Sequence, residues 1–204
     1  MTFVKICGIT RLDDAVAALE RGADALGFVF WPGSPRRIDP VRAREIVAAL
    51  PAPAVIVGVF VNEEPGRVNE IARIVGLNAV QLHGDETPAS IAVVRRPIIK
   101  ALSGGAIDAR AAEWPRNMPM LVDAHDPAKR GGTGMKADWR QASALAMKRR
   151  VLLAGGLTPD NVARAVAEVR PYGIDVSSGV ETAPGIKDRT KLDALFRALE
   201  AVTR

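Results

Sequence analysis

The sequence is poor in cysteine, in aromatic residues and in long apolar runs, and each shortage excludes a class of protein. Its 204 residues include one cysteine, so no intramolecular disulfide can form, which favours a reducing compartment. Aromatic residues make up 4%, too few for a platform on which nucleic-acid bases stack. No apolar run reaches the roughly 18 residues of a membrane span, so we expect no contact with a membrane. The start, MTFVKICGIT, lacks the features of a signal peptide, and we expect a cytoplasmic protein.

The charge balance favours a small anionic partner. The chain carries 28 basic and 23 acidic residues, a formal net charge of +5. The basic residues scatter along the chain and are not interleaved with aromatic residues, which argues against nucleic acid. Apolar residues make up 48% and charged residues 25%, values that are ordinary for a globular protein. The length predicts a single domain over residues 1–204. A small anionic substrate fits the net charge, although the charge could also serve solubility alone.

Apolar, β-branched runs alternate with amphipathic stretches along the whole chain. The runs that predict strands span 3–6, 25–30, 54–61, 78–82, 97–102, 118–122, 150–154 and 172–176. The stretches that predict helices span 12–21, 40–49, 65–75, 87–94, 106–113, 138–146, 159–169 and 188–202. Strands that alternate with helices form parallel βαβ units, and eight units predict an α/β fold, the closed (β/α)₈ or TIM barrel. A doubly wound open sheet is the alternative.

The active site of such a barrel lies at the carboxyl ends of the strands, so residues that end a strand are the first candidates. Cys7 ends the first predicted strand and shares a strand face with Lys5. A thiol beside a cation ionises more readily, and the thiolate is a base or a nucleophile, although a free cysteine often only packs in a core. Gln81 and His83 share a face at the end of the fourth strand and could bind a ligand, or His83 could only order its own loop.

The segment MLVDAHDPAKRGGTG offers a candidate acid. Asp123 follows three apolar residues at the end of the sixth predicted strand, where partial desolvation would let a carboxyl group act as an acid near neutral pH. Asp126 lies further into the loop, where we expect more solvent. The glycines of the run that follows, Gly132 and Gly134 among them, suggest backbone close to a ligand.

Glycine and serine follow the last two predicted strands. The residues concerned are Gly155, Gly156, Ser177, Ser178 and Gly179. Loops after the seventh and eighth strands of such barrels commonly bind phosphate through bare backbone N–H groups. Two such loops in these two positions predict a phosphate site. After the second strand, Arg36 could hold a carboxylate or a phosphate, although arginines in loops are more often only solvated.

The motifs taken in order resemble one enzyme family. They are KICGIT, GADALGFVF, SPR, VGVFVN, VQLHGDE, the Asp–GGTG segment, LAGGLTPDNV and DVSSGVE with PGIKD. Each is weak alone, but the ordered set spans residues 3–188 and resembles phosphoribosylanthranilate isomerase of tryptophan biosynthesis.

The resemblance implies an Amadori rearrangement of a phosphosugar, with neither a cofactor nor a metal site. N-(5-phosphoribosyl)anthranilate would become 1-(2-carboxyphenylamino)-1-deoxyribulose 5-phosphate. By the resemblance, Cys7 is the general base, Asp123 the general acid and Arg36 the contact to the anthranilate carboxylate. Alignment from GGTG backward would select Asp126 instead, but strand ends are fixed by the barrel, and we therefore choose Asp123.

One expectation goes beyond the resemblance. The eighth strand of a closed barrel lies beside the first, and Lys5 and Asp175 each lie two residues before a functional strand end. We therefore expect an ion pair between them inside the barrel, beneath Cys7. The pair would consume part of the lysine's charge and weaken its effect on the thiol.

Three other functions remain as alternatives. The first is a phosphate-binding aldolase that forms a Schiff base through Lys100, although we expect Lys100 to be a polar group of the barrel interior or of the substrate side. A phosphate-binding module without catalysis would not need both Cys7 and Asp123. A nucleic-acid binder would show steep salt dependence. Both a monomer and a homodimer are compatible with the sequence.

Overall fold

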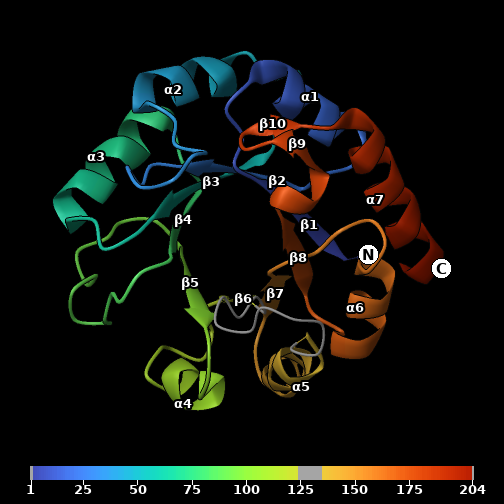
Figure 1. Cartoon of the computed structure of the whole chain (residues 1–204). Helices are drawn as coiled ribbons and strands as arrows, with labels where there is room; N and C mark the ends of the chain where they lie inside the picture. The colour runs from blue at the N-terminus through green and yellow to red at the C-terminus, as the bar shows by residue number, and fades with distance from the viewer. Residues whose placement is uncertain (1, 124–134, 204) are drawn as a thin grey trace.

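Eight parallel strands close into a barrel in chain order, as predicted (Figure 1). The computed structural model describes residues 2–123 and 135–203. The barrel strands are β1 (Phe3–Cys7), β2 (Ala25–Val29), β3 (Val55–Phe60), β4 (Ala79–Leu82), β5 (Ile98–Ser103), β6 (Met120–Asp123), β7 (Val151–Ala154) and β8 (Gly173–Val176). Each lies within two residues of its predicted run. The pairing of β1 with β8 closes the ring.

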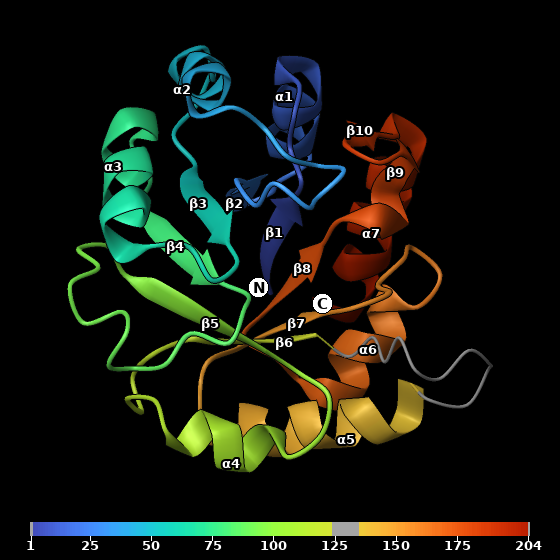
Figure 2. The same cartoon turned by 60° about the vertical axis from the view of Figure 1, so that its left-hand side comes forward.

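Helices follow all but one of the strands and surround the barrel (Figures 1 and 2). They are α1 (Leu12–Glu20), α2 (Pro40–Ala48), α3 (Pro65–Val75), α4 (Ile107–Ala112), α5 (Met135–Ala146), α6 (Val162–Val169) and α7 (Arg189–Thr203). A short 3₁₀ helix, η1 (Ser178–Val180), and a two-stranded sheet of β9 (Glu181–Ala183) and β10 (Ile186–Lys187) come between β8 and α7. Among the described residues, no helix combines the length and apolar character needed to cross a membrane.

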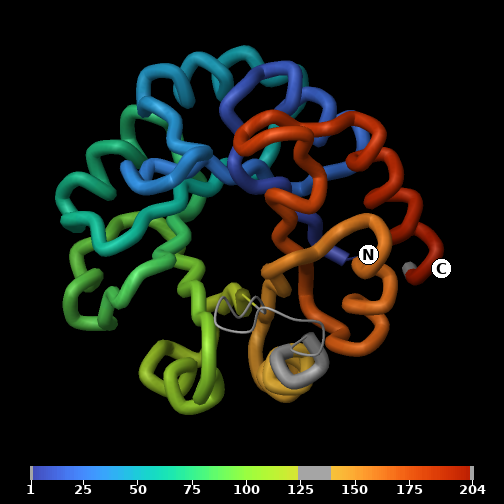
Figure 3. Tube along the Cα trace, viewed as in Figure 1, coloured from blue at the N-terminus to red at the C-terminus, as the bar shows by residue number. Residues whose placement is uncertain are grey.

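The helix predicted over residues 87–94 is absent, and turns connect β4 to β5 instead (Figure 3). Polar side chains form hydrogen bonds with backbone N–H and C=O groups that would bond to each other in a helix. Thr87 and Ser90 bond to each other's backbone N–H groups, and the Asn69 side chain bonds to the carbonyl of Val93 and the N–H of Arg95. Such local bonds compete with helix formation, so the amphipathic pattern predicted the wrong structure here.

Successive side chains of each barrel strand point to opposite faces of the sheet, and they therefore pack in two separate cores, one outside the barrel and one inside it. A large outer cluster of aliphatic and aromatic residues packs between the strands and the helices. Inside the barrel lie smaller clusters, one of Ala25, Val57 and Ala79 and another that includes Leu121 and Leu152. Small side chains leave room in the interior for charged groups and for a cavity at one end.

Candidate active site

A cavity of about 340 Å³ opens at the carboxyl ends of the barrel strands. Its size lies in the range of small-ligand sites. Its walls include nine of the residues predicted from the sequence: Cys7, Arg36, Gln81, His83, Asp123, Gly155, Gly156, Ser177 and Ser178. The barrel therefore brings together residues that are up to about 170 positions apart in the chain.

Cys7 lies above a buried ion pair. The Nζ of Lys5 donates to Oδ1 of Asp175 at 2.9 Å, and their side chains are 0% and 9% exposed. This confirms the pair expected from the closed barrel, because Lys5 and Asp175 are also direct partners in the β1–β8 register. Gly27 makes room for the group, since a Cβ there would lie 2.7 Å from the Cys7 sulfur and 2.9 Å from Nζ of Lys5.

The surroundings of Cys7 keep its thiol protonated at neutral pH. Burial raises the pKa of the thiol, and although the Lys5 charge lowers it, Asp175 opposes that effect. Burial alone would lower the pKa of Lys5, but the Asp175 carboxylate and Cys7 outweigh burial and raise it. Lys5 is therefore paired with the Asp175 carboxylate, as expected, and this pairing weakens its lowering effect on the pKa of the Cys7 thiol.

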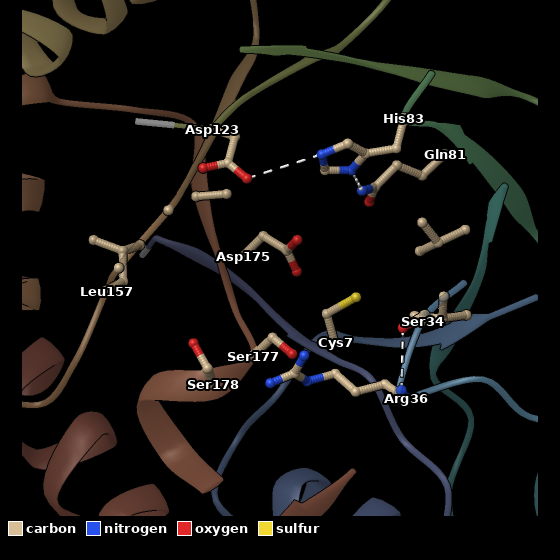
Figure 4. Close-up of a pocket in the computed structure, with 15 residues that line it drawn as sticks. Cys7, Ser34, Arg36, Gln81, His83, Asp123, Leu157, Asp175, Ser177 and Ser178 are labelled. Carbon is tan, nitrogen blue, oxygen red and sulfur yellow. Dashed lines mark hydrogen bonds and ion pairs between the residues drawn. The ribbon is translucent and has the colours of Figure 1, made fainter. Parts of the chain in front are cut away.

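Asp123 and His83 lie across the cavity from Cys7 (Figure 4). The Nε2 of His83 is 3.9 Å from Oδ2 of Asp123, and its Nδ1 is 3.0 Å from Nε2 of Gln81. Burial lowers the pKa of His83, more than the Asp123 charge raises it, so the ring is neutral at pH 7. The Gln81 NH₂ group can only donate and a carboxylate can only accept, which favours the tautomer with the proton on Nε2, facing Asp123.

Arg36 enters the cavity with one edge of its guanidinium already bound. Its Nε and Nη2 donate to the Glu181 carboxylate at 3.0, 3.1 and 2.6 Å. The backbone around Gly8 fits closely against the Arg36 stem, because a Cβ on Gly8 would lie 2.6 Å from Cδ of Arg36. Both the stem and the head of the side chain are therefore held by the protein.

Lys187, on β10 of the same small sheet as Glu181, also contacts the Glu181 carboxylate. Its Nζ donates to Oε1 of Glu181 at 2.8 Å, to the carbonyl of Cys7 at 2.5 Å and to the carbonyl of Ser177 at 3.3 Å. Burial lowers the pKa of Lys187, an effect that Glu181 partly offsets. Burial would raise the pKa of Glu181, but the bonds from Arg36 and Lys187 outweigh burial and lower it.

The loops after β7 and β8 meet at the cavity. Gly155 and Gly156 have φ values of +85° and +64°, a conformation that glycine adopts without strain. Gly179, predicted with this group, is not a lining residue. It packs against the β7 loop instead, where a Cβ would lie 1.8 Å from the Leu157 carbonyl oxygen.

Two buried acceptors in the cavity wall have no hydrogen-bond partner among the described residues: Oε1 of Gln81 and Oγ of Ser177. Buried polar atoms normally have partners, so these two are suited to polar groups of a ligand. Both residues were candidates from the sequence.

Lys100 is placed differently from expectation. Its side chain points out of the barrel and is 2% exposed. Its Nζ bonds to Oε2 of Glu86 at 2.7 Å and to the carbonyl of Gly84 at 2.6 Å, and it lies 5.7 Å from the Trp114 ring. The expectation of an interior or substrate-side group was therefore wrong, and Lys100 is not placed to act as a Schiff-base nucleophile.

Some predicted residues lie outside the described part of the chain, and two residues of the site were not predicted. Gly132, Gly134 and Asp126 lie in the range 124–134, which the structure does not describe. Sequence reasoning assigned no role to Glu181 or Lys187. Both stand within the quoted segments DVSSGVE and PGIKD, which was the only signal that could have drawn attention to them.

Comparison with known proteins points to one family. Residues 4–198 match the family model of N-(5'phosphoribosyl)anthranilate (PRA) isomerase. An N-(5'-phosphoribosyl)anthranilate isomerase of Citrifermentans bemidjiense is 52% identical over 197 residues, which is 96% of each chain. One of Pseudomonas putida is 47% identical over 199 residues, again 96% of each chain.

Solved structures agree with the sequence relatives. The phosphoribosyl anthranilate isomerase of Thermotoga maritima has a TM-score of 0.89 and 44% identity, covering 98% of this chain and 100% of that one. A second isomerase structure contains reduced 1-(o-carboxyphenylamino)-1-deoxyribulose 5-phosphate and has a TM-score of 0.86, with 42% identity over 98% and 100% of the two chains. The chain therefore belongs to the phosphoribosylanthranilate isomerase family of tryptophan biosynthesis.

Proposed function

We propose that this protein converts N-(5-phosphoribosyl)anthranilate to 1-(2-carboxyphenylamino)-1-deoxyribulose 5-phosphate without a cofactor. The observation that carries the proposal is a single cavity with the Cys7 thiol and the Asp123 carboxyl group on opposite walls and the Arg36 guanidinium beside them. The reduced product in the related structure has a phosphate and an aryl carboxylate. This cavity offers a basic group and two glycine-rich loops to such a ligand.

The anionic ends of the substrate have distinct partners in the proposal. The phosphate binds to the loops after β7 and β8, through backbone N–H groups near Gly155, Gly156 and Gly179 and through the hydroxyls of Ser177 and Ser178. The free Oγ of Ser177 supports this placement. The carboxylate binds to the edge of Arg36 that Glu181 leaves open.

Two proton transfers with the protein and a final tautomerisation make up the proposed reaction. Asp123 protonates the ribose ring oxygen, the bond from C1 to that oxygen breaks, and an iminium forms at C1 and nitrogen. The Cys7 thiolate, which is the minor form of the thiol because burial raises its pKa, then removes the hydrogen from C2, which the iminium has made acidic, and the electron pair forms an enolamine. Tautomerisation moves the proton of the C2 hydroxyl to C1 and gives the ketone. A well-placed acid or base accounts for a rate factor of about 10²–10⁴.

Neighbouring groups bind the sugar and set the charge around the acid. His83 is neutral, so it adds no positive charge near Asp123, although its Nε2 lies 3.9 Å from the Oδ2 of that carboxyl group. Gln81 has an unpartnered Oε1 that accepts a hydrogen bond from a substrate hydroxyl. Gly132 and Gly134 complete the proposed substrate contacts.

A fluorescence assay tests the proposal. The substrate is made in situ from anthranilate and phosphoribosyl pyrophosphate with an added transferase, and loss of anthranilate-type emission follows its conversion. We expect rapid loss with the wild type and none above background with the double variant Cys7→Ala/Asp123→Asn. Circular dichroism checks that both are folded. A folded wild type that is no faster than the double variant would contradict the proposed function.

A further inference from the structure

Glu181 binds one edge of Arg36 and leaves another edge for a ligand. The carboxylate takes Nε and one Nη2 hydrogen, with contacts of 3.0, 3.1 and 2.6 Å. A guanidinium has five N–H donors, so both Nη1 hydrogens and the second Nη2 hydrogen remain. Among the described residues, no acceptor bonds to Nη1 of Arg36, and the side chain is 23% exposed at the cavity wall. The remaining edge has the fork geometry that binds a carboxylate through two parallel bonds.

The charges of the cluster favour an incoming anion. Arg36 and Lys187 share the single carboxylate of Glu181, so the three side chains carry one excess positive charge. Lys187 is fully buried, and its bonds go to Glu181 and to the carbonyls of Cys7 and Ser177. The positive charge that a ligand can reach is therefore at the exposed edge of Arg36 and not at the buried ammonium group of Lys187.

We propose that Glu181 is a positioning residue for substrate specificity. It turns Arg36 so that the free edge of the guanidinium faces the cavity, and the enzyme thereby selects phosphosugars that carry an aryl carboxylate. Lys187 fixes Glu181 in turn and connects it to the backbone beside the thiol and beside the β8 loop. This inference rests on the proposed function, because it assigns the carboxylate end of that substrate to Arg36.

The alternative is that Glu181 only neutralises buried charge. The two possibilities differ in what they predict for ligands with and without a carboxylate. A purely structural role would change the affinity for both ligands by the same factor, whereas a positioning role changes the ratio of the two affinities.

The test measures two dissociation constants for each variant. The ligands are reduced 1-(2-carboxyphenylamino)-1-deoxyribulose 5-phosphate and the same compound without its carboxyl group. We expect the wild type to prefer the first by one to two orders of magnitude, the size of a two-bond charged contact. Glu181→Gln should reduce this preference about tenfold, while the affinity for the ligand without the carboxyl group changes less than threefold.

Variants of the partner residues serve as controls. Lys187→Met keeps the Glu181–Arg36 pair but removes one partner of Glu181, so it should lower the preference less than Glu181→Gln does. Glu181→Gln/Lys187→Met removes both buried charges and provides the measurement should Glu181→Gln alone fail to fold. In an Arg36→Met background, the Glu181 substitution should leave the preference unchanged, because Glu181 acts through Arg36.

The outcomes separate this inference from the proposed function. If the folded Glu181 variants keep the wild-type preference for the ligand with the carboxyl group, the positioning role is overturned. An equal loss of affinity for both ligands is one such result. A wild type that binds neither ligand would instead overturn the proposed function.

Discussion

Removal of the Asp175 carboxylate would leave a charged lysine inside the barrel without a partner. Lys5 has no exposed surface, and its Nζ is 2.9 Å from Oδ1 of Asp175. Asp175→Asn keeps the shape of the side chain and removes its charge. Breaking a buried ion pair in this way costs about 3–5 kcal/mol. At about 2–4 °C per kcal/mol for a chain of this size, we expect the Tm to fall by about 6–20 °C.

The pH dependence of the loss has a definite sign. In the wild type the folded-state pKa of Lys5 is raised, so the stability from the pair is fully present below the ordinary lysine pKa and is lost as pH rises through the folded value. In Asp175→Asn, burial without a partner lowers the folded-state pKa of Lys5, so stability increases as pH rises toward the ordinary value. The difference in the free energy of unfolding between the wild type and Asp175→Asn should therefore become smaller from pH 7 to pH 10.

Urea unfolding at several pH values tests this reasoning. All proteins carry Cys7→Ala, because burial raises the folded-state pKa of the thiol above its ordinary value and the thiol would therefore add its own pH dependence to the stability. The matched control is Lys5→Met/Asp175→Asn, which has no buried ammonium and should recover much of the lost stability. A loss below about 1 kcal/mol in Asp175→Asn, or a double variant no more stable than the single one, would refute the account of the barrel interior.

Three further predictions concern the thiol, a loop contact and the lysine outside the barrel. Because burial raises the pKa of Cys7, kcat/KM should rise with pH beyond the ordinary thiol range, and a flat profile from pH 6 to 9 would contradict this. Gly179→Ala should weaken binding of the reduced product at least tenfold and destabilise the fold by about 1–3 kcal/mol or more, since its Cβ would overlap the Leu157 carbonyl. Borohydride with a phosphosugar ketone should leave the protein mass unchanged, because Lys100 is bound to Glu86, and a trapped adduct would contradict the assignment.

The strand positions and the Lys5–Asp175 pair were predictable because both follow from the closed barrel of eight parallel strands. Apolar runs mark strands that are covered on one face and packed on the other, and the closure of eight parallel strands places β8 beside β1. The segment 87–94 was not predictable from its periodicity. Its helical pattern was overridden by Asn69, a residue of α3 that is distant in sequence and bonds to the segment's backbone.

The candidate site was most predictable where residues end a barrel strand or lie in the loop that follows it. Cys7 and Asp123 end β1 and β6, so their position follows from the topology. Lys100 was misplaced because of its strand face: it alternates along β5 with Ile99 and Ala101, which face the barrel interior, so its own side chain faces the helices. Glu181 belongs to the β9–β10 sheet, whose return to the cavity depends on contacts that no short-range pattern encodes.

The residual activity of single variants tests the central claim, that Cys7 and Asp123 transfer the two protons. Turnover of phosphoribosylanthranilate is measured for Cys7→Ser, Asp123→Asn and Asp126→Asn, each shown to bind the reduced product. We expect kcat to fall by a factor of about 10²–10⁴ in each of the first two variants and by less than tenfold in Asp126→Asn. Near-normal kcat in Cys7→Ser or Asp123→Asn would contradict it, and a large loss confined to Asp126→Asn would assign the acid to the other aspartate.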